Sequence, residues 1–353
     1  MKIPTLFGRV KAHDKVLLAK NLSAMLEAGL SLSRALAVIE RQTRNKKLKE
    51  ALSVINQDLA AGKTFNETIS KFPNIFSPLF ISMVKAGEES GSLSASLQTV
   101  GLQLERASEL TRKIRGAMMY PGVILLAMCG IAFFMLTNVV PAITDTFKEM
   151  NVELPTTTKL VIFVSDFLKN NVIVTLLGIA VIAFSLWSFT KTRVGKRSVH
   201  WLILHIPIIN VLVKETNAAR TARTMSSLLT AGVDILAAVE ITQDVLQNVY
   251  YKDIIGEARP IVERGEPLST VFAKHENLYP PFVGEMLAVG EETGQMAKML
   301  LGVAVYYEDE VEQKTKDMSS IIEPFLMIII GAAVGFFAIS MLGPIYSIGD
   351  AIK

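Results

Sequence analysis

The chain has 353 residues, and half of them are hydrophobic. Its mean hydropathy of +0.39 is too high for an ordinary soluble domain and too low for a many-span transporter, so we expect a few membrane spans plus substantial soluble mass. The formal net charge of +3 is too small to indicate binding to DNA or RNA, so no nucleic-acid partner is expected.

The first 117 residues predict a cytoplasmic bundle of about six helices. Apolar residues recur at helical spacing, and glycines or prolines such as Gly29, Gly62 and Pro73 punctuate them. A Gly-Glu-Glu-Ser-Gly turn at 87–91 precedes a long helix, which we expect from about Leu93 to Ala117. Since no alternating strand pattern of useful length occurs, the predicted fold class is an all-α membrane protein.

Three uncharged apolar segments are long enough to cross a bilayer. They occupy residues 121–141, 172–189 and 324–342. A fourth apolar run, residues 201–213, is too short and is interrupted by Pro207, so we expect it to be interfacial or buried.

Basic residues flank one end of each span, and this bias predicts the orientation. The flanking residues are Arg106, Arg112, Lys113 and Arg115, then Lys191, Arg193, Lys196 and Arg197, then Lys314 and Lys316. We therefore expect a multi-pass protein with a cytoplasmic N-terminus and a periplasmic C-terminus. The expected division is a first cytoplasmic helical bundle (1–117), a span (118–141), a periplasmic loop with an amphipathic helix (142–171), a span (172–190), a second cytoplasmic helical bundle (191–320), a span (321–345) and a periplasmic tail (346–353).

One internal offset, 203 residues, relates the two halves of the chain. The paired positions include Gly29 with Gly232, Gly87-Glu88-Glu89 with Gly290-Glu291-Glu292, Gly91 with Gly294, Pro121 with Pro324, and Pro141 with Pro344. No gap is needed from Ser23 to Pro141. The chain is therefore a tandem duplication whose unit is a helical bundle with its own membrane span, and both copies enter the membrane in parallel. The span at 172–190 has no counterpart and returns the chain to the cytoplasm.

The two Gly-Glu-Glu-x-Gly turns have two interpretations. The glycines permit φ > 0 and the acidic residues cap helices, which is the structural interpretation. The functional interpretation is an acidic contact patch for a basic partner. Gly62-Lys63-Thr64 resembles the end of a nucleotide-binding loop, but Gln57 stands where that motif needs glycine, so we interpret it as a helix-cap turn.

Glu323 stands beside Pro324 at the inner edge of the third span, where the first copy has Tyr120. An ionisable residue within a membrane span indicates a functional role. At the edge of a span, the side chain can instead extend to the water at the membrane surface. Both interpretations are kept.

No feature predicts catalysis, a cofactor or a metal. The four histidines show no ligand spacing, and no nucleophile motif occurs. The chain is therefore expected not to be an enzyme.

The order of several local motifs resembles the inner-membrane platform family of type II secretion F proteins and type IV pilus PilC proteins, over nearly the whole chain. The motifs are residues 228–233 (Leu-Leu-Thr-Ala-Gly-Val), both Gly-Glu-Glu-x-Gly turns, Tyr120-Pro121, Val139-Val140-Pro141, residues 154–158 (Leu-Pro-Thr-Thr-Thr), residues 207–209, residues 219–224, Tyr279-Pro280-Pro281 and Glu323-Pro324.

The resemblance implies a non-enzymatic hub in the bacterial inner membrane. Its implied partners are a hexameric cytoplasmic secretion or pilus ATPase, pilin or pseudopilin subunits, other inner-membrane assembly proteins, the lipid bilayer and further copies of the chain in a dimer or tetramer. Secretion, pilus and competence systems all use such platforms. The two long helices, at about 93–117 and 296–321, are expected to carry ATP-driven movement toward the spans.

Two other functions remain as alternatives at this point. A small transporter would need polar or charged residues in its spans, and these segments have no charge. A membrane scaffold for signalling would need an outward sensory domain, whereas the outward loop is short.

Overall fold

The computed structural model describes residues 10–149, 155–207 and 209–351, and within these residues every regular element is a helix. The predicted all-α fold class is confirmed. Leu154 of the motif at residues 154–158 and the middle residue of the motif at residues 207–209 lie outside the described residues, as do the first nine residues and the last two. The chain divides into two compact units: unit 1 comprises residues 1–113 and 197–313, and unit 2 comprises residues 114–196 and 314–353.

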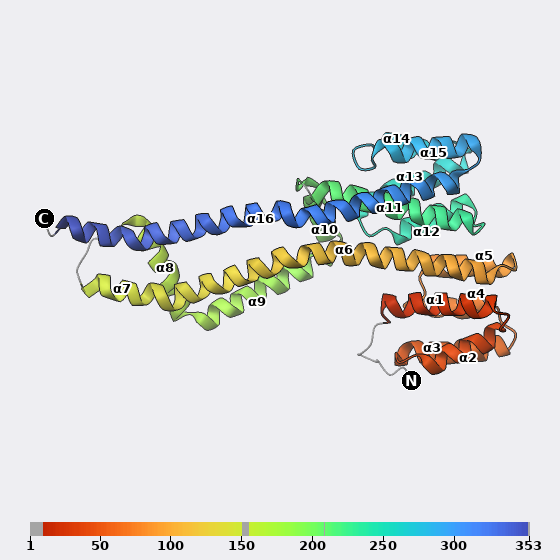
Figure 1. Ribbon diagram of the computed structural model, residues 1–353, viewed down its shortest axis with the longest axis horizontal. Helices are drawn as coiled ribbons and strands as arrows, with labels where there is room; N and C mark the ends of the chain where they lie inside the picture. The colour runs from red at the N-terminus through yellow and green to blue at the C-terminus, as the bar shows by residue number, and fades with distance from the viewer. Residues whose placement is uncertain (1–9, 150–154, 208, 352–353) are drawn as a thin grey trace. The chain divides into compact units, whose positions relative to one another are not determined.

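Both copies of the repeat build the same series of helices in unit 1 (Figure 1). The first copy has α1 (Ala12–Glu27), α2 (Leu32–Gln42), α3 (Lys46–Ala60), α4 (Phe65–Ser70), α5 (Pro78–Glu89) and the start of α6 (Leu93–Phe134). The second has α11 (Ile209–Thr230), α12 (Ile235–Val245), α13 (Val249–Glu263), α14 (Ser269–Lys274), α15 (Pro281–Thr293) and the start of α16 (Met296–Ala351). α2 and α12 match residue for residue at the offset of 203, as do α3 and α13.

Local sequence explains where these helices begin and end. Thr64 accepts a hydrogen bond from the backbone of Glu67, whose side chain in turn bonds the backbone of Thr64, so α4 starts on a capping box. Gly62 before it has φ of +85° and carries no Cβ that would oppose that conformation. The interpretation of residues 62–64 as a helix-cap turn is therefore confirmed.

The two copies share a buried interior within unit 1. The first copy's core contains Leu22, Leu36, Leu52 and other apolar side chains, and it also takes in Leu228, Ala238 and Ile241 from the second copy. A second core surrounds Tyr251, Phe272 and Tyr279. The sequence predicted two bundles, and in the structure their apolar side chains pack together along one interface, here called the seam between the copies. Removal of apolar surface from water favours this association.

Unit 2 contains the apolar helices. After the later part of α6 come the π-helix η1 (Met135–Val139), α7 (Val140–Glu149), α8 (Thr156–Asn170) and α9 (Val172–Phe189), and the chain returns in the later part of α16. Three described helices are long and apolar enough to cross a membrane, within the ranges Leu93–Thr146, Val172–Phe189 and Met296–Leu342. Their exposed large apolar side chains, such as Leu126 at 77% and Ile328 at 69%, are suited to lipid rather than water.

The fourth apolar run spans the end of α10 (Arg193–His205) and the start of α11, on either side of Pro207. Trp201 and Leu202 are exposed, whereas Leu212 is buried. The expected break at Pro207 is present.

Candidate functional site

The expected Gly-Glu-Glu-x-Gly turns lie mostly within the last turns of two helices, since α5 continues to Glu89 and α15 to Thr293. The first glutamate of each of these turns caps a short helix. The carboxylate of Glu88 accepts hydrogen bonds from the backbone N–H groups of Phe65 and Asn66, both at 2.7 Å, at the start of α4. At the equivalent place, Glu291 accepts bonds from the backbone N–H groups of Leu268 and Ser269. The first N–H groups of a helix have no partner within it, and they carry partial positive charge. Both carboxylates therefore fix α4 or α14 against the following helix.

The glycines of the two turns have two separate roles. Gly91 and Gly294 both have φ of +69°, in the left-handed region where a side chain is strained. Gly87 and Gly290 allow a close approach of helices: a Cβ on Gly87 would lie 3.1 Å from Cα of Leu93, and one on Gly290 would lie 2.9 Å from Cα of Met296. The structural interpretation thus accounts for three of the four repeated residues in each turn.

The second glutamate of each turn is exposed and has no role in holding the turn. The carboxylate Oε1 of Glu89 lies 3.8 Å from Nζ of Lys85, four residues earlier in the same helix, and both side chains are more than half exposed. Glu292 is exposed and has no hydrogen bond or ion pair among the described residues. Contact with a basic partner therefore stays a prediction for Glu89 and Glu292 alone.

We expect Glu291→Ala to destabilise the folded chain by about 1–2 kcal/mol, because it leaves the two N–H groups at the start of α14 without their charged acceptor. The matched control Glu292→Ala removes an exposed carboxylate and should change stability by less than about 0.5 kcal/mol. Urea denaturation of the full chain in detergent, followed by circular dichroism, measures both. Equal effects of the two substitutions would contradict the capping role.

A repeated ion pair joins the first and last helices of each copy. Lys20 bonds Glu105 at 2.6 Å, and Arg223, at the equivalent position, bonds Glu308 through two nitrogens at 2.8 and 2.6 Å. The first pair is over one third exposed, whereas the second is 16–17% exposed. The repeat register could have revealed this pair, because Lys20 and Arg223 also stand 203 residues apart, but the expected register began at Ser23.

Polar side chains cross the seam between the copies. The side chain of Gln103 donates to the hydroxyl of Thr224 at 3.2 Å and accepts from that of Ser227 at 3.3 Å, and all three residues are buried. Lys113 forms an ion pair with Glu312. These contacts, like the ion pairs above, use residues that sequence reasoning did not select as candidates, because their partners are far apart in the chain.

A half-buried cation, Arg220, lies beside this seam. Arg220 donates to the hydroxyl of Thr111 at 3.3 Å, and burial lowers the pKa of its guanidinium. Since an arginine pKa starts far above neutrality, the group keeps its charge.

The remaining candidates fall in different places and form no single site. Gly29 and Gly232, with φ of +83° and +81°, end α1 and α11 in unit 1. In unit 2, Tyr120 and Glu323 are exposed, Pro121 and Pro141 are buried, and Pro324 is exposed. Pro344 lies within α16.

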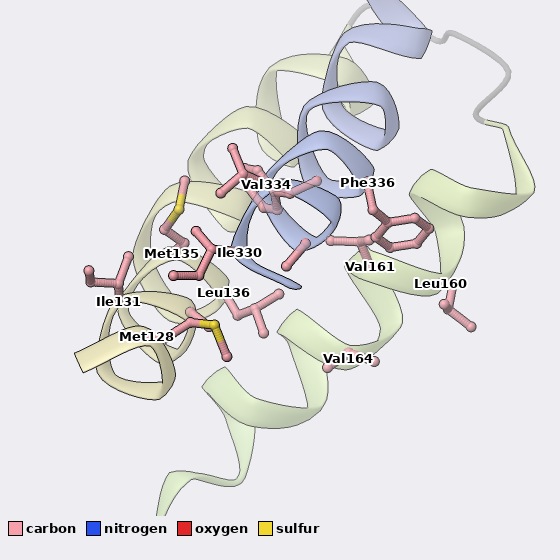
Figure 2. Close-up of a pocket in the computed structure, with 13 residues that line it drawn as sticks. Met128, Ile131, Met135, Leu136, Leu160, Val161, Val164, Ile330, Val334 and Phe336 are labelled. Carbon is pink, nitrogen blue, oxygen red and sulfur yellow. The ribbon is translucent and has the colours of Figure 1, made fainter. Parts of the chain in front are cut away.

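An apolar cavity of about 380 Å³ lies within unit 2 (Figure 2). Met128, Ile131 and Met135 line it from α6 and η1, Val161 from α8, and Ile330 and Val334 from α16. None of the described side chains that line it is charged. Among the described residues no group of histidine, cysteine, aspartate or glutamate is placed to hold a metal ion.

Comparison with known proteins gives two kinds of match. The family "Type II secretion system (T2SS), protein F" matches residues 18–141 and again residues 221–344, which is the same offset of 203. A type IV pilus assembly protein PilC of Thermus thermophilus is 36% identical over 99% of this chain and 86% of its own length. A type II secretion system protein F of Aeromonas hydrophila is 30% identical over 99% of this chain and 90% of its own length. The PilC protein of Pseudomonas aeruginosa is 28% identical over 98% of this chain and 92% of its own length.

Proposed function

The chain belongs to the type II secretion system protein F family, and we propose that it is the inner-membrane platform of a pilus or secretion machine, coupling a cytoplasmic ATPase to assembly of pilin-like subunits. The observation that carries the proposal is the double match of the family to both copies of the repeat, together with relatives of both kinds along almost the whole chain. The platform has no catalytic chemistry of its own in this proposal, and the ATPase supplies the energy.

We place unit 1 in the cytoplasm. Basic residues precede the first span, follow the second and precede the third, and positive residues remain on the cytoplasmic side of a membrane. Both bundles then face the ATPase, while α7 and α8 face the periplasm. We propose for the segments the boundaries expected from the sequence, with the spans at 118–141, 172–190 and 321–345.

α6 and α16 connect the proposed ATPase side to the membrane. α6 spans Leu93–Phe134 and α16 spans Met296–Ala351, so each helix has residues in both units. Pro121 and Pro324 each remove one backbone hydrogen bond near the unit boundary, which favours bending there. We propose that movement of unit 1 reaches the spans through these two helices.

Co-purification tests the partner. The tagged full chain, extracted from membranes of its own cells in mild detergent, is expected to recover a hexameric cytoplasmic ATPase. The double variant Glu89→Lys/Glu292→Lys reverses the exposed charges while leaving the capping glutamates in place. Reduced recovery of the ATPase by this variant would support contact at the turns.

Recovery of a histidine kinase without any ATPase would contradict the platform proposal and favour a signalling scaffold. Flux of a solute into liposomes that contain this chain alone would favour a transporter. Recovery of the ATPase by both the wild type and the charge-reversed variant would support the platform and place the contact elsewhere on the chain.

A further inference from the structure

Pro141 and Pro344 are equivalent positions of the two copies, and each leaves a backbone carbonyl without its helical donor. A proline nitrogen carries no hydrogen. In the α-helical register of α16, the nitrogen of residue 344 faces the carbonyl of Ser340. In the first copy the register is that of a π-helix, since the N–H of Val140 bonds the carbonyl of Met135, so the nitrogen of Pro141 faces the carbonyl of Leu136.

Two hydroxyls of α8 supply the missing donors. The hydroxyl of Thr158 donates to the carbonyl of Ser340, and the hydroxyl of Ser165 donates to the carbonyl of Leu136. Both side chains are completely buried. An unpaired carbonyl is costly in an apolar surrounding, and a neighbouring helix's serine or threonine is a known way to satisfy one.

The spacing on α8 suits a helix that contacts two neighbours at once. Thr158 and Ser165 are seven positions apart, so they lie on the same face of α8. Two helical turns rise by about 10 Å, which is close to the 8–10 Å between the axes of packed helices. Figure 1 shows α8 running across the direction of α6 and α16.

We propose that α8 is a two-point clamp that sets the register of the two repeated spans. Thr158 and Ser165 are positioning residues, each paired with one proline: Thr158 with Pro344, and Ser165 with Pro141. The clamp has no counterpart in the repeat, because one helix serves both copies. Sliding of one span past the other must break at least one of the two hydrogen bonds.

A double-mutant cycle on the full chain in lipid nanodiscs tests the pairing. Ser165→Ala is expected to lower the midpoint of thermal unfolding by about 2 °C, and Thr158→Val is expected to act similarly. In the Pro141→Ala background, residue 141 regains an N–H that can donate to the carbonyl of Leu136 in η1, so Ser165→Ala should have less than half of its original effect. The crossed combination of Ser165→Ala with Pro344→Ala should be additive, and this distinguishes the clamp from general packing.

Equal effects of Ser165→Ala in the wild-type and Pro141→Ala backgrounds would overturn the Ser165 half of the clamp. Equal effects of Thr158→Val in the wild-type and Pro344→Ala backgrounds would overturn the Thr158 half.

If a proline variant does not fold, two substitutions of Ser165 that differ only in the hydroxyl test the clamp instead. Ser165→Thr keeps a hydroxyl and should keep the wild-type midpoint. Ser165→Val has the shape of threonine without the hydroxyl, and it should lower the midpoint. Equal midpoints for these two variants would overturn the proposal.

Discussion

Insertion of a flexible Gly-Ser segment after Ala117 is expected to abolish filament assembly while leaving the chain in the membrane. Ala117 lies in α6, between the bundle residues of unit 1 and the first span. Glycine destabilises a helix interior by about 1 kcal/mol per residue, so the insertion ends the helix locally and uncouples any rotation or tilt of the bundle from the span. The measurement is the number of surface filaments, or the amount of secreted substrate, in cells that carry the variant in place of the wild-type chain.

The matched control is the same insertion after Gly62. That residue is exposed, lies in a turn and has φ of +85°, so the backbone there tolerates added length. The control should assemble filaments, and immunoblots of membranes should show equal amounts of both variants. Normal filament assembly by the Ala117 variant would refute transmission of movement through α6, while leaving ATPase binding to be decided by co-purification.

The second large effect is expected from the repeated ion pair. Arg223→Met should destabilise the chain by about 2–3 kcal/mol, because it leaves the carboxylate of Glu308 desolvated and without its two-nitrogen partner. The side chains of this pair are only 16% and 17% exposed, so water replaces the lost bonds poorly. Urea denaturation of the full chain in detergent gives the change in the free energy of unfolding.

The first copy of the repeat provides the control for this substitution. Lys20→Met removes the equivalent ion pair, whose side chains are 39% and 36% exposed, and it should cost less than about 1 kcal/mol. The double variant Arg223→Met/Glu308→Leu should recover part of the loss, because it also removes the stranded charge. A larger loss from Lys20→Met than from Arg223→Met would show that burial does not control the strength of the two pairs.

Much of the local structure could be predicted from the sequence. Glycines, prolines and capping residues control backbone conformation within a few positions of themselves, so Gly29, Gly62 and Gly91 correctly indicated helix ends. The roles of Glu88 and Glu291 were only half predicted. Their capping chemistry was expected, but they cap helices more than twenty residues earlier in the chain, and only the packing of α4 on α5, and of α14 on α15, brings them there.

The sequence by itself determined the duplication, the helical class, the three apolar segments and the family, because each depends on residue order along one chain. The tertiary structure decided which distant residues meet: the shared core of the two copies, the pairing of Arg223 with Glu308, and the contacts of α8 with both spans. The physical reason is that periodicity and turn chemistry act over a few residues, whereas burial of apolar surface selects partners across the whole chain. Pro141 and Pro344 show the division clearly, since the sequence reveals the donors that are missing and only the fold reveals the hydroxyls that replace them.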